Sequence, residues 1–299
     1  MQVTFNLVES TTMVCHTISM VVKMTTTRGD ITPFQFPGGE WHFDIPDYAQ
    51  PRALTIINDQ HIMDDLAIAG LWVDWCKSVG EKAIINLPYL PAARADRGTP
   101  FGGKVYANMI NALGADEVRV FDPHSSVVPE LINNVRVIFF PRVVRHAVFG
   151  KNYAAQKVYD GIIAPDKGAV NRASMISRST NLPLYRASKV RDFKTGKLKN
   201  YSAPRLLDRN KKYLVVDDIC DGGGTFMLLA QALDLPKEQL GIWVSHGIFS
   251  GNAGNLADHY SDIYTTDSVV PYTNVATKVV KLAPYLTSPY AEHLNERNH

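Results

Sequence analysis

The sequence predicts an α/β protein made of two consecutive units, each with a central, mostly parallel sheet. Short β-branched runs alternate with longer segments in which apolar residues recur at three- and four-residue spacing, a pattern typical of parallel strands whose connecting helices cover both faces of the sheet. The length of 299 residues fits two units at about 150 residues per domain. We expect the units to meet near residue 145, which divides the chain into residues 1–145 and 146–299.

In the first unit, strands and helices are expected in turn. Glycine enters the left-handed region at low cost, so Gly114 is expected to end the second helix. The expected elements are a strand at Leu54–Asn58, a helix at His61–Val79, a strand at Ala83–Asn86, a helix over about Lys104–Leu113, and strands at Glu117–Phe121 and Val135–Phe140.

The second unit begins near Gly150 and repeats the alternation. Its expected elements are a strand at Gly161–Ala164, a helix at Val170–Ser179, strands at Leu184–Arg186 and Tyr213–Val216, a helix at Phe226–Leu233, a strand at Leu240–Ser245, a helix near Asn255–His259, and strands around Ile263–Tyr264 and Thr277–Leu282.

Composition excludes several classes of protein. Lys and Arg number 31 and Asp and Glu 29, and the resulting net charge of +2 gives no reason to expect a nucleic acid or a membrane surface as partner. The three cysteines are widely spaced without a CxxC motif, which argues against a disulfide framework and for a reducing compartment. No apolar run approaches the ~20 residues that span a bilayer, and no secretory signal is visible. We therefore expect a cytoplasmic protein.

The sharpest local signal is a glycine-rich segment that follows a buried strand, at Tyr213–Phe226. The apolar run ends in adjacent carboxylates, and a third acid, three glycines and a threonine then lead into an apolar helix. Glycines let the backbone approach an anion, and the start of a helix offers free N–H groups and the positive end of its dipole. Paired carboxylates accept hydrogen bonds from vicinal hydroxyls, so phosphate plus diol indicates a ribose 5-phosphate group. The residues expected to bind it are Asp217, Asp218, Asp221, Gly222, Gly223, Gly224 and Thr225.

Other interpretations of this segment fit less well. A solvated glycine-rich turn is the bland alternative, but acids at the carboxyl end of a strand lie where α/β sheets bind their ligands. The chain has neither a GxxxxGK[ST] loop nor a GxGxxG that follows a strand, so a Walker loop and a dinucleotide site are not supported. Within the segment, Cys220 is expected to be a small buried filler.

Five further segments accompany this loop along the chain: Phe36–Glu40, Pro88–Arg97, Phe121–Ser125, Ala164–Gly168 and His246–Gly251. In this order they resemble the motifs of the ribose-phosphate pyrophosphokinase (phosphoribosyl pyrophosphate synthetase) family, a branch of the type I phosphoribosyltransferase superfamily. The resemblance covers most of the chain. It implies two phosphoribosyltransferase-like domains, the first carrying the ATP-binding motifs and the second the loops for ribose 5-phosphate and pyrophosphate.

The resemblance also implies an activity. A member of this family is an Mg²⁺-dependent transferase of nucleotide biosynthesis, which moves the β,γ-pyrophosphoryl group of ATP to the anomeric hydroxyl of ribose 5-phosphate and releases AMP. The implied ATP-binding residues are Phe36, Glu40, Arg94, Asp96, Arg97 and His124. Fixed guanidinium groups suit the oxygens of a triphosphate, which agrees with the two arginines in that set.

Three further assignments come from the resemblance. The pyrophosphate loop is Asp166, Lys167 and Gly168, and the metal contacts are His124 and Asp166. Because Mg²⁺ prefers oxygen ligands, ATP and water are expected to hold most of its coordination sphere. Lys189 and Arg191 are the implied catalytic pair, on a mobile basic loop that closes over the phosphates. A structural or interfacial role is expected for His246.

Departures from the family pattern keep alternatives open. Gly38, Ala95 and Gly223 stand where the family usually has Asp, Gln and often Ala. Three rival functions therefore remain: pyrophosphoryl transfer to a larger 5-phosphoribosyl acceptor such as ADP-ribose, a phosphoribosyltransferase, and a catalytically silent regulatory homologue. The resemblance implies a homo-oligomer, dimer-based and commonly hexameric, in which the adenine segment reaches a neighbouring subunit.

Overall fold

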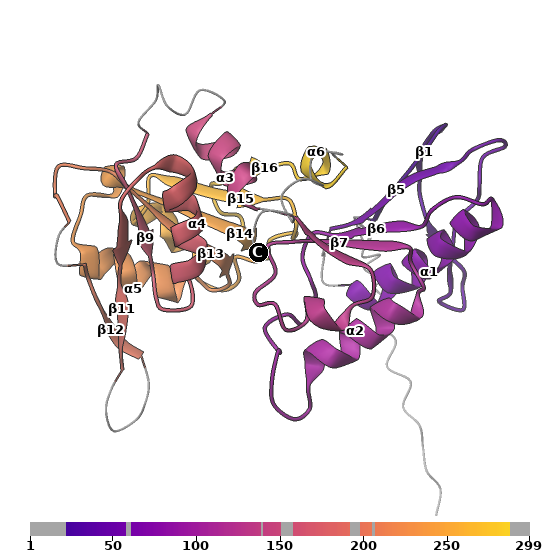
Figure 1. The fold of residues 1–299 in the computed structure, drawn as a ribbon, viewed down its shortest axis with the longest axis horizontal. Helices are drawn as coiled ribbons and strands as arrows, with labels where there is room; N and C mark the ends of the chain where they lie inside the picture. The colour runs from indigo at the N-terminus through magenta and orange to yellow at the C-terminus, as the bar shows by residue number, and fades with distance from the viewer. Residues whose placement is uncertain are drawn as a thin grey trace, which may run out of the picture.

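The computed structural model describes residues 22–57, 61–138, 140–150, 158–191, 198–204 and 207–287; for residues 189–191 and 198–200 it describes the backbone alone. Two six-stranded sheets and two short antiparallel hairpins make up the strands of this part of the chain. The two sheets lie at opposite ends of an elongated molecule (Figure 1).

The first sheet has the strand order β2-β1-β5-β6-β7-β8. From β5 to β8 neighbouring strands are parallel, whereas β1 is antiparallel to β2 and β5. The antiparallel strands add an edge that the sequence analysis did not predict. The strands are β1 (Val22–Thr26), β2 (Gly29–Ile31), β5 (Pro51–Ile56), β6 (Ile84–Leu87), β7 (Glu117–Phe121) and β8 (Val135–Ile138).

Helices α1 (Ile62–Ser78) and α2 (Gly102–Ala112) lie on the same face of this sheet (Figure 1). The expectation of helices on both faces therefore differs from what the described residues show here. On the other face Thr55, Asn86 and Arg119 stand in register on neighbouring strands and form a polar row. The Arg119 guanidinium donates to the carbonyl oxygen of Leu286, 2.7 Å away. No helix of the described part of the chain is long and apolar enough to cross a membrane.

The second sheet is parallel throughout, in the order β10-β9-β13-β14-β15-β16. Its strands are β9 (Gly161–Ala164), β10 (Leu184–Arg186), β13 (Tyr213–Cys220), β14 (Leu240–Gly247), β15 (Asp262–Thr266) and β16 (Lys278–Val280). The helices that accompany it are α3 (Phe140–Phe149), α4 (Val170–Thr180), α5 (Gly224–Leu233) and α6 (Ala283–Leu286). Short 3₁₀ helices occur at η1 (Pro129–Leu131), η2 (Lys237–Gln239) and η3 (Ala253–Asp258).

Both faces of the second sheet are covered, as expected. Alternate residues of β13 point to opposite sides, so Leu214 packs in one apolar cluster with Ile176 of α4, while Val215 packs in another with Leu229 of α5. This two-sided burial explains why the strands of the second unit read as continuous apolar runs. It also fixes the direction in which the polar residues at the strand ends point.

Three features differ from the sequence expectation or extend it. Strand β13 continues to Cys220, so the adjacent acids expected just beyond it lie inside it. The region expected as a helix near Asn255 is the short 3₁₀ helix η3. Two hairpins were not expected: β3 (Phe34–Gln35) with β4 (Trp41–His42), and β11 (Ser188–Arg191) with β12 (Leu198–Ser202). The domain boundary near residue 145 stays a prediction; α3 crosses it and packs against α4.

Gly241 offers a test of the packing of the second sheet. A Cβ at this position would overlap the hydroxyl and ring of Tyr159, which is 2% exposed and whose hydroxyl lies 3.3 Å from Asp262 Oδ2. We expect Gly241→Ala to lower the free energy of unfolding by about 1–3 kcal/mol, the usual cost of overpacking, in urea denaturation followed by circular dichroism. Gly254→Ala is the control, because nothing lies within 4 Å of its added Cβ. Equal stability of the two variants would contradict the packing described.

Candidate active site

A cavity of about 440 Å³ lies where segments from both sheets meet. Its walls follow the carboxyl ends of four parallel strands, β6, β7, β9 and β13, which is where α/β sheets bind ligands. The first half of the chain contributes Arg94, Asp96, Arg97, His124 and Ser125, and the second contributes Asp166, Gly168, Ala169, Arg172, Asp217, Asp218, Ile219, Asp221, Gly222, Gly223, Gly224, Thr225 and Phe226.

Most residues selected from the sequence thus line one cavity. These include the whole expected ribose 5-phosphate loop, both motif arginines, and the two expected metal contacts. Residues separated by more than a hundred positions in the chain are brought together here, because two sheets present their strand ends to the same space.

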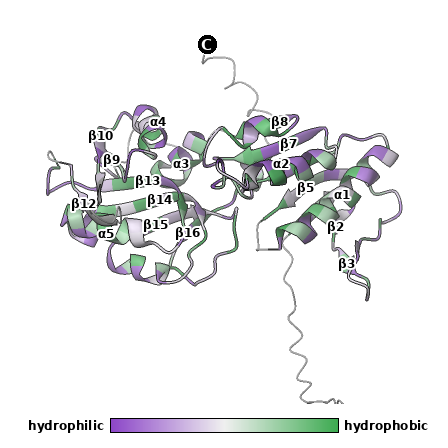
Figure 2. Ribbon diagram, turned by 90° about the horizontal axis from the view of Figure 1, so that it is seen from below, coloured by the Kyte–Doolittle hydropathy of each residue, from purple (hydrophilic) through white to green (hydrophobic). Residues whose placement is uncertain are grey.

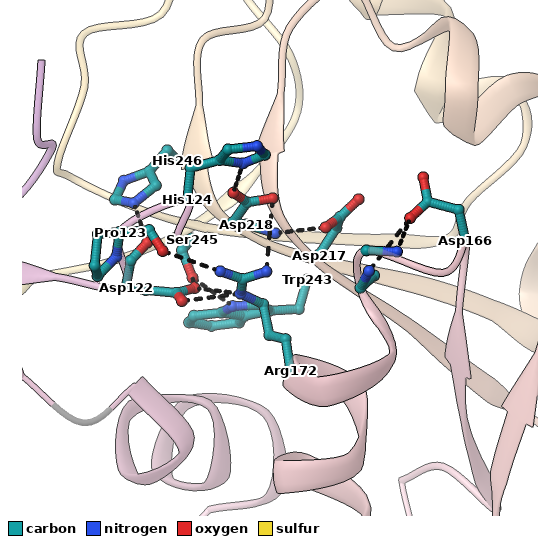
Figure 3. Close-up of polar contacts among 12 residues, drawn as sticks. Asp122, Pro123, His124, Asp166, Arg172, Asp217, Asp218, Trp243, Ser245 and His246 are labelled. Carbon is teal, nitrogen blue, oxygen red and sulfur yellow. Dashed lines mark hydrogen bonds and ion pairs between the residues drawn. The ribbon is translucent and has the colours of Figure 1, made fainter. Parts of the chain in front are cut away.

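The adjacent acids of β13 lie in different electrostatic surroundings. Burial raises the pKa of Asp217 well above its usual range, and the neighbouring charge of Asp218 raises it further. Burial alone would also raise the pKa of Asp218, but the hydrogen bond with His124 and the charge of Arg172 outweigh it and lower this pKa well below its usual range. Asp217 Oδ1 accepts the backbone N–H of Asp218 at 2.9 Å (Figure 3). The two pKa values therefore move in opposite directions, because His124 and Arg172 lie next to the carboxylate of Asp218.

His124 joins the first half of the chain to this pair. Its Nδ1 lies 2.6 Å from Asp218 Oδ2 (Figure 3). The hydrogen bond to Asp218 raises the pKa of His124, against the opposing effect of burial. Because Nδ1 is committed to the carboxylate, Nε2 is the ring nitrogen left for a ligand.

The glycine loop contains one position, Gly223, whose backbone conformation favours glycine. Gly223 has φ +77°, and a Cβ there would lie 3.2 Å from Leu256 Cγ. Ala in its place, as the family pattern allows, would therefore be strained here. Gly224 has ordinary φ and nothing within 4 Å of an added Cβ. No side chain caps the first turn of α5, so the N–H groups at its start remain available to an anion.

A second contact between the halves lies at the rim of the glycine loop. The guanidinium of Arg94 is 3.1 Å from Asp221 Oδ2, and Ser250 Oγ donates to Asp221 Oδ1 at 2.5 Å. The hydrogen bond from Ser250 and then that from Arg94 lower the pKa of Asp221. The sequence analysis assigned Arg94 and Asp221 to different substrates, and the structure shows them in direct contact.

The two remaining loops hold their own polar groups. Asp166 Oδ1 accepts the backbone N–H groups of Gly168 at 2.8 Å and Ala169 at 3.2 Å, just before α4. Lys167 does not line the cavity. Asp96 is 8% exposed and accepts a hydrogen bond from Arg97 Nε at 3.0 Å, which lowers the pKa of Asp96. Asp96 thus orients Arg97 in addition to lining the site.

The donors His124 and Asp166 fit a metal ion that takes most of its ligands from bound small molecules and water. Among the described residues, no group of three or more His, Cys, Asp or Glu side chains could hold a metal ion alone. A histidine whose other ring nitrogen binds a carboxylate is a common arrangement next to a metal, and His124 with Asp218 has this form. The carboxylate of Asp166 supplies the oxygen donor that Mg²⁺ prefers.

Besides Lys167, four expected residues are not among those that line the cavity. Phe36 and Glu40 belong to the β3–β4 hairpin, where Phe36 stacks on His42 with 5.9 Å between ring centroids and is 49% exposed. This hairpin lies at the far end of the molecule from β13 (Figure 2). Lys189 and Arg191 have their backbones in β11, paired with β12, and their side chains fall outside the described part of the structure.

The structural roles predicted for Cys220 and His246 are confirmed. Cys220 is fully buried and burial raises its pKa to about 12, so the thiol is a filler and not a nucleophile. His246 is 1% exposed; its Nε2 lies 3.1 Å from the carbonyl oxygen of Asp122 and its Nδ1 2.8 Å from Ser268 Oγ. Because a carbonyl only accepts, Nε2 carries the proton, and His246 has a structural role.

Sequence reasoning missed Arg172 and Ser250. Arg172 lines the cavity from the first turn of α4. A signal for it was present: Arg172 is four residues before the buried Ile176, so a charged residue stands on the apolar face of the helix. Ser250 lies in the loop that follows β14, inside the segment His246–Gly251 that the sequence analysis selected without assigning this serine a role.

The chain is an α/β protein in which the loops that follow the neighbouring strands β9 and β13 line one cavity. A structure of phosphoribosylpyrophosphate synthetase from Mycobacterium smegmatis has the same fold, with a TM-score of 0.66 and 22% identity, and covers 86% of this chain and 87% of the other.

In sequence, the chain is similar to curated ribose-phosphate pyrophosphokinases. It is 29% identical to that of Pyrococcus abyssi over 260 residues, which are 83% of this chain and 88% of the relative. It is 26% identical to that of Sulfurisphaera tokodaii over 266 residues, which are 83% and 87% of the two chains. No family model matches. The family resemblance predicted from the ordered motifs is confirmed by these relatives over most of the chain.

The glycine loop yields a test with a matched control. We expect Gly223→Ala to lower the free energy of unfolding by about 1–3 kcal/mol, because an alanine at positive φ is strained. Gly224→Ala should leave stability unchanged or raise it slightly, since this glycine begins α5 at ordinary φ and has room for a methyl group. Urea denaturation of both variants measures the difference. Similar losses in the two variants would show that the loop conformation does not depend on Gly223.

Proposed function

We propose that this protein is an ATP-dependent pyrophosphokinase that converts ATP and ribose 5-phosphate into phosphoribosyl pyrophosphate and AMP. The observation that carries the proposal is the shared cavity: the glycine loop with its paired carboxylates and the motif arginines of the first half face the same space. The curated relatives bear the name ribose-phosphate pyrophosphokinase, which supports the same activity.

The second half of the chain is proposed to bind ribose 5-phosphate. The uncapped start of α5 and the open positions at Gly222 and Gly224 suit the phosphate, whose charge the helix dipole favours. Asp217 and Asp218 would accept hydrogen bonds from the vicinal hydroxyls of the sugar.

The first half is proposed to bind the ATP phosphates through Arg94 and Arg97. An incoming polyphosphate would take over Arg94 from Asp221, since the ion pair is exposed and weakly held. When bound, Mg²⁺ would neutralise phosphate charge and polarise the transferred group. We assign His124 and Asp166 as its protein contacts, together with oxygens from ATP and water.

Transfer needs positioning and charge neutralisation more than covalent chemistry. The anomeric hydroxyl would attack the β-phosphorus of ATP and lose its proton to water. The bond between that phosphorus and the oxygen that bridges it to the α-phosphorus would break, and AMP would leave with this oxygen. We assign Lys189 and Arg191 to stabilise the charge that develops on the transferred group. Their position on the β11–β12 hairpin, a projection beside the second sheet (Figure 1), is compatible with closure over the cavity.

The adenine-binding role of Phe36 and Glu40 requires a neighbouring copy of the chain. Their hairpin lies away from the cavity of its own chain, and Phe36 presents half of its surface to solvent. We propose a homo-oligomer in which each hairpin completes the ATP site of a neighbour. The free, buried Cys76 and Cys220 are compatible with a cytoplasmic location.

The proposed reaction is tested by mass spectrometry of the products formed from ATP, Mg²⁺ and a panel of acceptors. We expect AMP and phosphoribosyl pyrophosphate with ribose 5-phosphate, and neither product when EDTA replaces Mg²⁺. Faster AMP release with ADP-ribose would assign a larger acceptor. Consumption of phosphoribosyl pyrophosphate with a nucleobase would identify a phosphoribosyltransferase, and no turnover with any substrate would identify a silent homologue.

The catalytic loop is tested by Lys189→Ala. We expect turnover to fall by about two orders of magnitude or more, as for the loss of a charge that stabilises a transition state, while ribose 5-phosphate still binds with little loss in calorimetry. Lys211→Ala is the control, because Lys211 pairs with Asp208 at 3.5 Å on the exposed surface. Wild-type turnover in Lys189→Ala would remove this residue from the mechanism.

A further inference from the structure

Arg172 contacts two of the segments that build the cavity and belongs to a third. Its Nε lies 2.9 Å and 3.1 Å from the two carboxylate oxygens of Asp122, and one terminal nitrogen donates to the carbonyl oxygen of Pro123 at 3.2 Å. The other terminal nitrogen lies 3.8 Å from Asp218 Oδ1 (Figure 3). The arginine itself stands in the first turn of α4, directly after the loop of Asp166. One guanidinium thus links the ends of β7, β9 and β13.

Asp122 is fully engaged by this contact and by the second sheet. Besides Arg172, its carboxylate accepts a hydrogen bond from Ser245 Oγ, which in turn accepts the indole N–H of Trp243 at 3.2 Å. Its backbone carbonyl accepts the N–H of His246. Asp122 has φ +38°, a conformation that a non-glycine residue keeps only when its surroundings hold it. This acid therefore anchors the first half of the chain in the second and is not available to a metal ion.

The contacts of Arg172 and His124 close a loop of interactions. Arg172 holds Asp122 and Pro123, the two residues that precede His124, and it also faces the carboxylate that His124 binds. Arg172 therefore restrains His124 relative to Asp218 in two ways. It holds the backbone that precedes His124, and it lies next to the carboxylate that His124 binds. The arginine side chain is only 12% exposed, so solvent competes little with these contacts.

A lysine could not make the same set of contacts. Guanidinium is planar and presents several N–H groups in a fixed fork, whereas ammonium is a point charge on a flexible stem. At this position a lysine would still neutralise Asp122. It would not hold a carboxylate, a carbonyl oxygen and a second carboxylate together.

We propose that Arg172 is a positioning residue that fixes the His124 loop of the first half against Asp218 of the second, and so sets the geometry between the two substrates. The proposal rests on the proposed function for its effect on turnover. The contacts themselves are independent of that function.

The test compares Arg172→Lys with Arg178→Lys, which changes an exposed arginine on the same helix. Arg172→Lys keeps a charge beside Asp122, so the chain should still fold. We expect kcat for AMP formation to fall roughly 10- to 100-fold, as when a residue that orients a ligand is lost, with Arg178→Lys at the wild-type value. In the substrate-free protein, hydrogen–deuterium exchange should become faster in peptides that cover residues 121–126 and 217–222 and stay unchanged in β9 and β14.

Two results would overturn the proposal. A wild-type kcat in Arg172→Lys would show that the fork is not needed. Faster exchange throughout the core strands would show a general structural role and not a positioning one. If the wild-type protein forms no AMP, the proposed function fails, but the exchange measurement still decides whether Arg172 holds the two loops together.

Discussion

Two adjacent, buried carboxylates lie at the carboxyl end of β13, and the other charged groups of the cavity have to compensate their charge. Burying such a pair is costly unless each charge is neutralised by a proton or by a partner. In this cavity the pKa of Asp217 is raised, and Asp218 is paired with His124 and Arg172. The pair therefore draws a histidine from the first sheet and an arginine from α4 into one site.

This arrangement separates the groups that build the cavity from those available to ligands. Asp122, Ser245 and His246 are buried and satisfied by one another, and they carry no free donor or acceptor into the cavity on the contacts described. Arg97 and the first residues of α5 line the cavity, and no side chain caps the N–H groups at the start of that helix.

Much of the fold could be predicted from the sequence because the second sheet is buried on both faces. Its strands are apolar throughout, and runs such as Gly161–Ala164 coincide with the observed strand. The first sheet was harder, since one of its faces is polar at Asn86 and Arg119, and the antiparallel strands β1 and β2 have no connecting helix to mark them. The β3–β4 hairpin is too short to leave a periodic pattern.

The part of the site whose residues are neighbours in the sequence could be predicted. The part whose residues are brought together only by the tertiary structure could not. Asp217, Asp218 and Gly223 belong to one motif, so their proximity was certain once the strand was identified. The contact of Arg94 with Asp221 joins residues 127 positions apart, and no local pattern encodes it. The same holds for Arg172, whose importance follows from where β7 ends relative to α4.

The contacts across the cavity also restrict how the two halves of the chain can evolve. Asp122 is held by α4 and β14, Arg94 by Asp221, and Arg119 by the carbonyl of Leu286. A chimaera that takes one sheet from this chain and the other from a diverged homologue would break several of these pairs at once. A substitution in one half is therefore tolerated only if it preserves the contacts with the other half. We expect the halves to coevolve as a unit instead of recombining as interchangeable modules.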